Sequence, residues 1–590
     1  MTYEEQIKNS IEIIHSGDKD QLEFIFSTEK RVLVEAAAGY GKTKSMISKI
    51  AYLIATKQVP NPKKILALTF SVNAAYKIKK DVVEQLPTIL QAQTGKSISI
   101  SNRIHVSNYH GFCRHILKLY GYLLHENLKN IDSFISIDDN NVANLTSIGV
   151  DYNSAKFLSD FNAAVKRADK EFVKRELNEY NQKVISDIIT LDYIPYNAIL
   201  SLTTYLFDKY PNVLSFYRNY FPVIIVDEFQ DTNLLSFILI HKLISENTKT
   251  YFVGDSLQRI YGFIGAVPDL MNRVETLYGM KKVEFKQNYR FKNNLQMLLL
   301  DRNIRENAKD LANPNIESNV KINFNQLETQ QLESEYIVQL IEKIQIENPE
   351  IQIAILFRNG HTNKNTQSVI RHFQEKGIDY FFALFTDEDE NYIRFHKQAM
   401  KAFSSLIKNH RRLSKNLCRV LIKIVKEIYK DDLENPLINS LLQLLTVFTG
   451  RLFLDYIFLT DEDRITFLQE TLENNALKQS VEFIGSKIII STIHAAKGLE
   501  WDFVILPDCE QYSIPSWFGL CADCSFKANC NIDFQRYGTK VLDELSVFYV
   551  AVTRAKKDVY FSASKMGIHS NGNYQPRNVS CFLLLKGIEI

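Results

Sequence analysis

The feature that most constrains this chain is an apolar run that leads through small residues into a helical pattern. The run Val32–Ala36 is followed by a glycine-containing turn, and a helix is predicted from Lys44 to about Ala55. This is the pattern GxxxxGK[ST] with Ala36 in the place of the first glycine. Such a turn aims backbone N–H groups and a helix N-terminus at an anion. A glycine turn before a helix is the alternative, but the strand–loop–helix context favours a phosphate site at Ala38, Gly39, Gly41, Lys42 and Thr43.

A second apolar run ends in acidic residues, as a partner for that site would. Val223–Val226 leads directly to Asp227 and Glu228. We expect Asp227 and the Thr43 hydroxyl to hold Mg²⁺, and Glu228 to orient and deprotonate an attacking water. An acidic cluster after a strand is usually a solvated loop. Following a phosphate loop, the catalytic interpretation is favoured.

Apolar strand-like runs alternate with helical patterns in two zones of the chain. Fully apolar strands separated by helices are typical of parallel sheets covered on both faces. We therefore predict an α/β protein with two such domains, each interrupted by a mostly helical stretch, at about 118–206 and 386–484. The first zone holds Val32–Ala36, Ile65–Phe70, Val223–Asp227 and Thr250–Val253; the second holds Val283–Phe285, Ile351–Phe357, Lys487–Ser491, Phe503–Leu506 and Val559–Ser562.

Composition excludes some classes of protein and leaves others open. The 590 residues carry 70 basic and 68 acidic side chains, so the net charge is +2. This value neither favours nor excludes nucleic-acid binding, and any basic surface must be local. Seven cysteines in so long a chain exclude a disulfide scaffold. The polar start Met1–Ser10 is unlike a signal peptide, and no apolar run reaches the ~18 residues of a membrane span. We expect a cytoplasmic protein with no membrane partner.

Further strings follow in a fixed order along both zones. They are Gln21 (21 residues before Lys42), Thr69–Ala75, Val106–His110, Asp227–Asp231, Gly254–Phe263, Gln287–Arg290, Thr492–Trp501 and Tyr549–Ala555. As a set they resemble the motifs of the UvrD/Rep/PcrA group of superfamily 1A DNA helicases. The resemblance covers both α/β zones.

The resemblance implies a fold and an activity. The fold would be two RecA-like domains, 1A and 2A, each with an insertion, 1B and 2B. Their bounds would be 1–117 and 207–282 for 1A, 118–206 for 1B, 283–385 and 485–590 for 2A, and 386–484 for a reduced 2B. ATP hydrolysis in the cleft between 1A and 2A would drive 3′-to-5′ stepping along single-stranded DNA, with single-strand/duplex junctions as substrates.

The resemblance also implies roles for residues around the nucleotide. Tyr289 would stack on adenine, Gln21 would bind its polar edge, and Glu500 would accept hydrogen bonds from the ribose hydroxyls. Gln258 would sense the γ-phosphate, and Arg290 and Arg554 would stabilise the transition state as arginine fingers. The alternatives are a surface salt bridge for Arg290 and core packing for Tyr289.

A single-strand track needs aromatic platforms and phosphate ligands. By position in the motifs, the candidates are Phe70, Asn73, Tyr109, His110, Tyr261, Phe263, Thr492 and His494. Simple packing is the alternative for each aromatic ring. Ile264 stands where the family often has arginine, so the motif departs from the family there. Residues 401–430 hold nine basic residues and one acidic residue on a helical pattern, which predicts a duplex-facing or partner-facing surface, or a solvated basic face.

The reduced second insertion leaves an alternative function open. The chain would then be a nucleotide-gated DNA-sensing ATPase that recruits a partner, for example a nuclease, without processive unwinding. Compact helicases of this kind occur in bacterial phage-defence systems such as Gabija, whereas larger relatives act in DNA repair. We find no nuclease motif within the chain itself.

Four cysteines form a second candidate metal site. Cys521, Cys524 and Cys530 have C-x2-C-x5-C spacing, and Cys509 precedes them. Four thiolates can bind Zn²⁺ or an iron–sulfur cluster. The spacing resembles the iron-staple ligands of AddB- and Cas4-type nucleases. The alternative is a loop with free cysteines.

Overall fold

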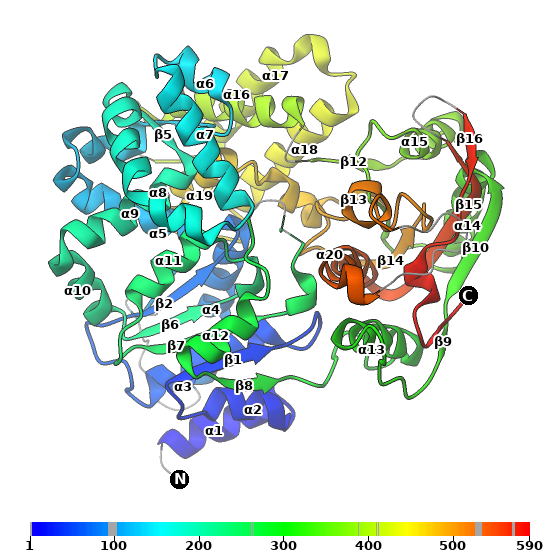
Figure 1. Ribbon diagram of the computed structural model, residues 1–590, viewed down its shortest axis with the longest axis horizontal. Helices are drawn as coiled ribbons and strands as arrows, with labels where there is room; N and C mark the ends of the chain where they lie inside the picture. Colours follow the sequence, from blue (N-terminus) through cyan, green and yellow to red (C-terminus); the bar gives the residue numbers. More distant parts are fainter. Residues whose placement is uncertain are drawn as a thin grey trace. The chain divides into compact units, whose positions relative to one another are not determined.

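The computed structural model describes residues 3–91, 103–260, 262, 265–386, 389–408, 410, 412–524, 534–568 and 573–590. The chain forms two compact units, Met1–Gln287 and Asn288–Ile590, each with its own sheet (Figure 1). In the part of the chain that is described, no helix is both long and apolar enough to cross a bilayer.

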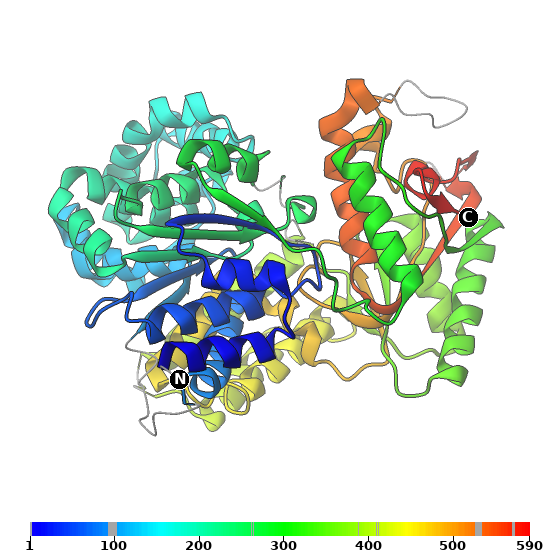
Figure 2. The same ribbon diagram turned by 90° about the horizontal axis from the view of Figure 1, so that it is seen from below.

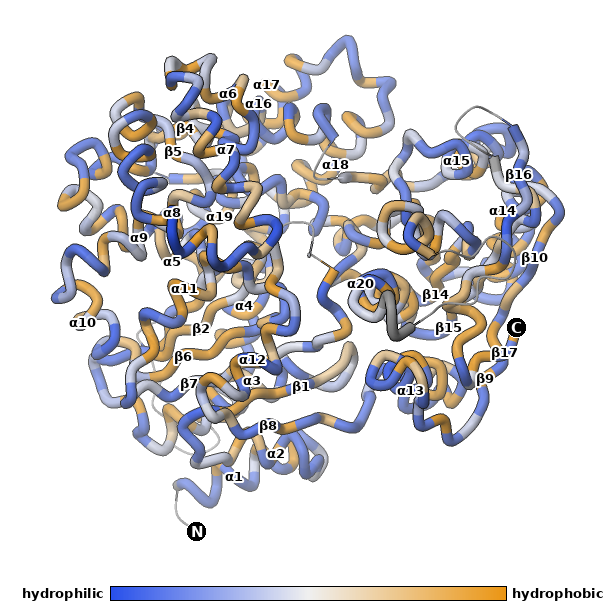
Figure 3. Tube along the Cα trace, in the orientation of Figure 1, coloured by the Kyte–Doolittle hydropathy of each residue, from blue (hydrophilic) through white to orange (hydrophobic). Residues whose placement is uncertain are grey.

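Unit 1 is built on a six-stranded sheet in which every pair is parallel. The strand order is β3-β2-β6-β7-β1-β8. The strands are β1 (Arg31–Glu35), β2 (Ile65–Thr69), β3 (Ile104–Asn108), β6 (Val223–Val226), β7 (Lys249–Gly254) and β8 (Lys281–Glu284). Successive side chains point to opposite faces, so Leu33 lies in one core while Val32 and Val34 lie in the other. The central strands are correspondingly hydrophobic (Figure 3).

Helices cover both faces of this sheet, as parallel crossovers require. One face packs against α1 (Tyr3–Ile14), α2 (Lys19–Phe26), α3 (Lys42–Ala55) and α4 (Val72–Gln91). The other packs against α5 (Tyr109–Tyr120), α9 (Tyr196–Lys209), α10 (Pro211–Tyr220), α11 (Leu234–Leu243) and α12 (Leu270–Tyr278). Figure 2 shows the dark-blue N-terminal helices and the cyan-to-green helices on opposite sides of the strands.

The predicted helical stretch of unit 1 shares a core with its sheet. It contains α6 (Val142–Ser147), α7 (Tyr152–Lys166), α8 (Lys170–Lys183) and the parallel pair β4 (Ile135–Ile137) and β5 (Tyr193–Pro195). Its short helices are η2 (Gly121–Leu123), η3 (Glu126–Ser133), η4 (Val184–Ile188) and η5 (Ile189–Leu191); η6 (Phe229–Asp231) and η7 (Ser256–Gln258) follow sheet strands. Leu158 of α7 and Leu33 of β1 belong to one hydrophobic cluster, so the stretch is continuous with the sheet domain.

Unit 2 has a second parallel sheet, in the order β10-β15-β14-β11-β13-β12, with β16 antiparallel to β15. The strands are β10 (Asn323–Thr329), β11 (Ile353–Phe357), β12 (Phe381–Ala383), β13 (Ile488–Thr492), β14 (Trp501–Leu506), β15 (Ala555–Ile568) and β16 (Tyr574–Pro576); β9 (Val320–Lys321) pairs with β17 (Ile588–Glu589). Its helices are α13 (Leu295–Lys309), α14 (Gln330–Glu347), α15 (Lys364–Lys376) and α20 (Phe534–Val552), with η11 (Trp517–Cys521) and η12 (Cys581–Leu584).

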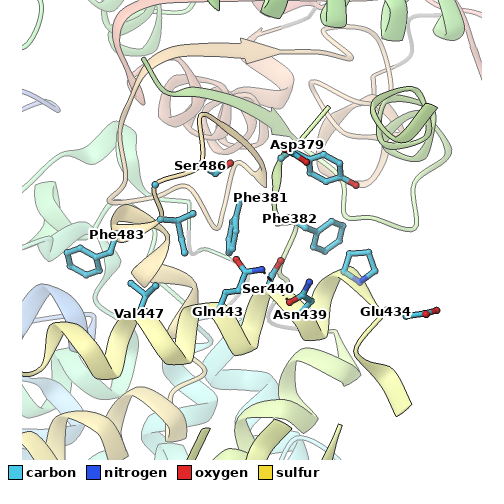
Figure 4. Close-up of a pocket in the computed structure, with 14 residues that line it drawn as sticks. Asp379, Phe381, Phe382, Glu434, Asn439, Ser440, Gln443, Val447, Phe483 and Ser486 are labelled. Carbon is cyan, nitrogen blue, oxygen red and sulfur yellow. Dashed lines mark hydrogen bonds between the residues drawn. The ribbon is translucent and has the colours of Figure 1, made fainter. Parts of the chain in front are cut away.

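The second helical stretch lies between β12 and β13. It comprises α16 (Glu390–Ile407), α17 (Lys415–Ile428), α18 (Pro436–Arg451) and α19 (Asp461–Glu473), with η9 (Lys430–Asp432) and η10 (Leu477–Phe483). An open pocket of about 530 Å³ lies where this stretch joins the sheet. Figure 4 shows Phe381 of β12 facing Ser440 and Gln443 of α18. The pocket's lining includes none of the residues predicted to bind nucleotide or DNA.

The predicted fold class, two parallel α/β sheets, is confirmed, but one strand was assigned to the wrong sheet. Val283–Phe285 was expected in the second domain, whereas Val283 lies in β8, which pairs with β1 of unit 1. Only Val283 is buried in β8; Lys281, Lys282 and Glu284 are exposed at the sheet edge, which weakens the apolar signal. The boundary between units therefore follows Gln287 rather than residue 282. The finer division into four domains stays a prediction.

Candidate nucleotide and DNA sites

The phosphate loop has the backbone that its glycines predict. Gly39 and Gly41 have φ values of 82° and 80°, in the left-handed region that side chains disfavour. A Cβ at Gly41 would also lie 2.7 Å from Nε2 of Gln21. Helix α3 begins at Lys42, immediately after this turn. The loop therefore presents a helix N-terminus, where backbone N–H groups and the helix dipole favour an anion.

Lys42 lies across the base of this loop. Its Nζ donates to the carbonyl of Ala36, at a distance of 3.0 Å. Its positive charge also acts on Asp227, where it favours the ionised carboxylate. Lys42 thus links the phosphate loop to the acidic end of β6, as predicted for one site.

Asp227 and Glu228 form an electrostatically strained pair. Asp227 is 5% exposed, its N–H donates to the carbonyl of Leu68 (2.9 Å), and its carboxylate accepts from the Glu228 N–H (3.0 Å). Burial, then the neighbouring Glu228, raise the pKa of Asp227. A divalent cation beside two adjacent acids would stabilise their ionised carboxylates. The Thr43 hydroxyl and the Asp227 carboxylate are oxygen ligands of the kind that Mg²⁺ prefers. The donor set fits Mg²⁺.

A hydrogen-bonded chain joins the predicted general base to the predicted phosphate sensor. Gln230 Nε2 donates to the Glu228 carboxylate, and Gln230 Oε1 accepts from the N–H of Asp255 (3.0 Å). Asp255 in turn accepts from Nε2 of Gln258 (2.7 Å). The sequence predicted no role for Gln230 or Asp255. The only feature of the sequence that pointed to these two residues was their position within the strings Asp227–Asp231 and Gly254–Phe263.

Gln21 lies against the phosphate loop. Its Nε2 donates to the carbonyl of Tyr40 (2.9 Å), and its side chain is almost fully buried. Adenine reading by Gln21 stays a prediction. A partner that the sequence did not predict is His15, which contacts the Gln21 amide oxygen.

In unit 2, three residues far apart in sequence meet at one place. The Arg290 guanidinium donates to the carbonyl of Thr553 and forms an ion pair with Glu500. Arg554, 4% exposed, donates from Nη1 to the carbonyl of Leu499 (3.1 Å) and from Nη2 to the Thr553 hydroxyl (3.2 Å). The structure thus brings Arg290, Arg554 and Glu500 together. The ion pair with Glu500 is also the kind of salt bridge that was the alternative to an arginine-finger role for Arg290.

The turn that carries Tyr289 is fixed by its neighbour. The side-chain oxygen of Asn288 accepts from the N–H groups of Arg290 (2.9 Å) and Phe291 (3.0 Å). Asn288 donates to Asp301 (3.2 Å), which also accepts from the Tyr549 hydroxyl (2.7 Å). Tyr289 itself is half-buried, so its ring is not a core residue.

The predicted DNA platforms of unit 1 divide into two groups. Phe70 and Asn73 are half-buried at the carboxyl edge of the sheet, where a ligand could reach them. Tyr109 is 2% exposed and its hydroxyl contacts the Thr232 hydroxyl (3.0 Å), so the prediction that it stacks on a base is wrong for this conformation. Tyr261 and Phe263 lie outside the described residues.

His110 is stacked and neutral in the structure, and its contact with a DNA phosphate stays a prediction. Its ring stacks on Tyr196, with centroids 3.6 Å apart. Burial lowers the pKa of His110 to about 3, so the imidazole is neutral at physiological pH. It can therefore offer a phosphate at most one N–H and no charge.

The two predicted phosphate ligands of unit 2 are also engaged internally. The Thr492 hydroxyl donates to the carbonyl of Phe385 (3.3 Å) and accepts from the N–H of Ala495 (3.1 Å). Burial lowers the pKa of His494 to about 3, with nearby Arg358 acting in the same direction. Thr492 therefore caps the turn after β13, and His494 is neutral.

The cysteine prediction is corrected at Cys509. Its thiol is fully buried and donates to the carbonyl of Leu506 (3.2 Å). Burial and the neighbouring carboxylates of Glu333, Asp508 and Glu510 raise the pKa of Cys509, which disfavours the thiolate that a metal needs. Cys530 lies outside the described residues. Within the described ranges, no three His, Cys, Asp or Glu side chains are grouped to hold a metal ion.

Comparison with known proteins gives matches in both units. A family model described as the UvrD/REP helicase N-terminal domain matches residues 18–279, and one described as the UvrD-like helicase C-terminal domain matches residues 384–566. A probable DNA helicase II homologue of Mycoplasma pneumoniae is 25% identical over 90% of this chain and 81% of its own length. The DNA helicase II of Rickettsia typhi is 25% identical over 93% of this chain and 92% of its own.

A third relative matches over a shorter range. The ATP-dependent DNA helicase PcrA of Staphylococcus epidermidis is 28% identical over 62% of this chain, and the match spans about half (51%) of that relative's length. The two family models and the geometry of the phosphate loop, the acidic pair and the arginine pair agree with one another. The chain belongs to the UvrD-like family of ATP-dependent DNA helicases.

Proposed function

We propose that the protein hydrolyses ATP to move 3′ to 5′ along single-stranded DNA, and that this movement separates duplex at single-strand/duplex junctions. The observation that carries the proposal lies in unit 1: hydrogen bonds through Gln230 and Asp255 join Glu228 to Gln258, and the charge of Lys42 on the phosphate loop acts on Asp227. Because the proposed base Glu228 and the proposed sensor Gln258 are connected in this way, we propose that the site hydrolyses ATP and does not merely bind it. Support for the direction comes from the family resemblance.

In unit 1, each residue has one task in hydrolysis. Lys42 and the loop N–H groups bind the phosphates, and Thr43 and Asp227 would hold Mg²⁺, which neutralises developing charge on the phosphate oxygens. Glu228 orients the attacking water and accepts its proton. Gln230 fixes the Glu228 carboxylate, and through Asp255 it links that carboxylate to Gln258, which binds the γ-phosphate.

In unit 2, Arg290 and Arg554 supply cationic groups for the transition state. Both guanidinium groups are held by backbone carbonyls, so their orientation is fixed before reaction. We propose that both arginines act on the nucleotide bound by unit 1. Arg290 then exchanges its partner Glu500 for the phosphate, which leaves Glu500 to accept from the ribose hydroxyls. Nucleotide binding and release then couple the two units and move the DNA.

Helix α17 offers a surface for DNA. Its apolar side packs inward through Leu417, Leu421 and Val425. Its exposed side carries a basic row, Lys415, Arg419, Lys423 and Lys426. Such a row attracts phosphates independently of sequence.

A strand-displacement assay tests the proposal. Duplexes with a 3′ or a 5′ single-stranded tail are compared, with ATP and Mg²⁺, for the native chain and the Glu228→Gln variant. We expect displacement only from the 3′-tailed duplex and only with Glu228 intact. Displacement from the 5′-tailed duplex would show that the protein moves 5′ to 3′, opposite to the proposed direction. DNA-stimulated hydrolysis with no displacement from either substrate would favour a DNA-sensing ATPase that recruits a partner.

A further inference from the structure

A buried histidine joins the first helix to the amide beside the phosphate loop. His15 directly follows α1 and is 2% exposed. Its Nδ1 contacts Oε1 of Gln21, and its Nε2 lies 2.8 Å from the hydroxyl of Ser48 on α3. The N-terminal family model begins its match at residue 18, after α1 and His15. His15 therefore lies outside the matched region, whereas its partners Gln21 and Ser48 lie within it.

The partners of the Gln21 amide determine which way it faces. The carbonyl of Tyr40 can only accept, so the nitrogen of Gln21 must face it. The amide oxygen then faces His15, and His15 Nδ1 must carry the hydrogen. Burial lowers the pKa of His15, so the ring is neutral and its Nε2 accepts from Ser48. The donor and acceptor assignments of all four residues follow from this chain.

Helix α1 holds His15 in place. Ile7 and Ile11 lie in the hydrophobic core that α1 shares with α3. The Tyr52 hydroxyl donates to the Glu4 carboxylate (3.1 Å), and Lys44 Nζ donates to the carbonyl of Ile14 (2.7 Å). The imidazole is thus anchored by a docked helix on one side and by α3 on the other.

We infer that His15 is a positioning residue that makes the nucleotide site selective for adenine. The inference rests on the proposed function, in which Gln21 binds the adenine of ATP. With one lone pair used by His15 and one hydrogen used by Tyr40, the amide keeps one acceptor and one donor. Adenine offers the matching pair, an exocyclic amine and a ring nitrogen. Guanine places an oxygen where the amine would be, so it meets the Gln21 oxygen unfavourably.

Without the His15 donor, the amide loses one of the two contacts that oppose its rotation and keeps only the Tyr40 carbonyl. A rotated amide presents nitrogen where it presented oxygen, and it then accepts guanine. The consequence is a loss of discrimination between bases. A defect in loop folding would instead weaken ATP and GTP equally, so the two explanations give different results.

The test compares His15→Phe, which keeps a ring but removes the donor, with His15→Asn, which keeps a donor near the position of Nδ1. The ratio of kcat/KM for ATP to that for GTP is measured with single-stranded DNA present. Binding of N-methylanthraniloyl-ATP and -GTP is titrated in parallel, which needs no turnover. Tyr52→Phe is the matched control, because it loosens α1 from α3 without contact to Gln21.

We expect His15→Phe to lower the ATP/GTP ratio about 3- to 10-fold, the worth of one hydrogen bond, while His15→Asn and Tyr52→Phe keep the native ratio. An unchanged ratio in His15→Phe, or a parallel loss for both nucleotides, would overturn the inference. If His15→Phe does not fold, Ser48→Ala is used instead, because it removes the other hydrogen-bond partner of the His15 ring. We then expect a smaller fall in the ATP/GTP ratio, judged by the same criteria. Failure of the proposed function is separate: the native chain would then hydrolyse neither nucleotide, and the binding ratio would still test His15.

Discussion

At the scale of single residues, burial decides which groups of this protein carry charge. Asp227, His110 and His494 all have pKa values shifted toward the neutral form, chiefly by burial. At the proposed ATP site, a nucleotide and a cation would offset the cost of a charge on Asp227. Glu228, whose carboxylate is fixed by Gln230, is the residue best placed to accept a proton from water.

Glu228→Gln keeps the shape of this side chain and removes its basicity. We expect turnover to fall by about 10²–10⁴-fold, the usual contribution of a general base, while ATP and DNA binding persist. Steady-state ATPase assays and nucleotide titration measure the two effects. Glu246→Gln, on an exposed loop of the same unit, is the control. Turnover near the native rate would remove Glu228 from the role of base.

Three buried acids of unit 2 predict a pH dependence of stability. Burial raises the pKa values of Glu333, Asp508 and Glu510, and repulsion from Asp508 raises those of Glu333 and Glu510 further. In the unfolded chain such carboxyls ionise near pH 4 to 4.5, so above that pH the native state holds protons that the unfolded state has lost. Stability therefore decreases as pH rises toward the raised values.

Glu510→Gln should reduce this dependence, because a neutral amide replaces an acid that accepts from the N–H and hydroxyl of Ser564. We expect the thermal unfolding midpoint of the native chain to fall between pH 5.5 and 8.5, and that of the variant to fall less. Glu342→Gln, exposed on α14, is the control. Parallel curves for the variant and the native chain would contradict the assignment.

At the scale of elements, one face of helix α17 packs inward and the opposite face is exposed and proposed to bind DNA. Its inward residues hold it to the helical stretch of unit 2, so changes on its exposed face leave the fold intact. The same division gives a chain of nearly balanced charge a local basic surface, which is the surface proposed for DNA.

Replacing Lys415, Arg419 and Lys423 by Gln should weaken DNA binding and reduce its salt dependence. Each lost phosphate contact lowers the slope of log K against log salt by about 0.7–0.9. Fluorescence anisotropy with tailed duplex at several salt concentrations measures both quantities. Lys170→Gln with Lys174→Gln, exposed on α8 of unit 1, controls for loss of general positive charge. An unchanged slope would show that α17 does not contact DNA.

At the scale of the whole molecule, the proposal requires residues of both units to act on one nucleotide. Lys42 and Glu228 belong to unit 1, and Arg290 and Arg554 belong to unit 2. Hydrolysis should therefore be sensitive to a residue that lies outside the unit with the phosphate loop.

Arg554→Ala tests this requirement. We expect hydrolysis to slow on the order of 10³-fold with little change in ATP affinity, since the guanidinium acts on the transition state. Single-turnover hydrolysis and nucleotide titration separate the two effects. Arg371→Ala, exposed on α15 of the same unit, should leave both unchanged. A defect in affinity alone would place Arg554 outside the reaction.

Local patterns made much of this protein predictable. The phosphate loop needs glycine at the left-handed positions 39 and 41, and short apolar runs such as Ile65–Phe70 favour buried strands. Neither feature depends on distant partners. The phosphate loop, the acidic pair and the parallel sheets could therefore be read from neighbouring residues alone.

Contacts between distant segments could not be predicted in this way. The sheet to which β8 belongs, the burial of Tyr109 under Thr232 and the linkage of His15 to Gln21 depend on which segment covers which. Sequence alone determined what each short segment can form, because backbone sterics and hydrophobic periodicity act over a few residues. Tertiary structure decided which side chains are exposed, charged or paired, because desolvation and hydrogen bonding depend on neighbours that lie tens or hundreds of residues away.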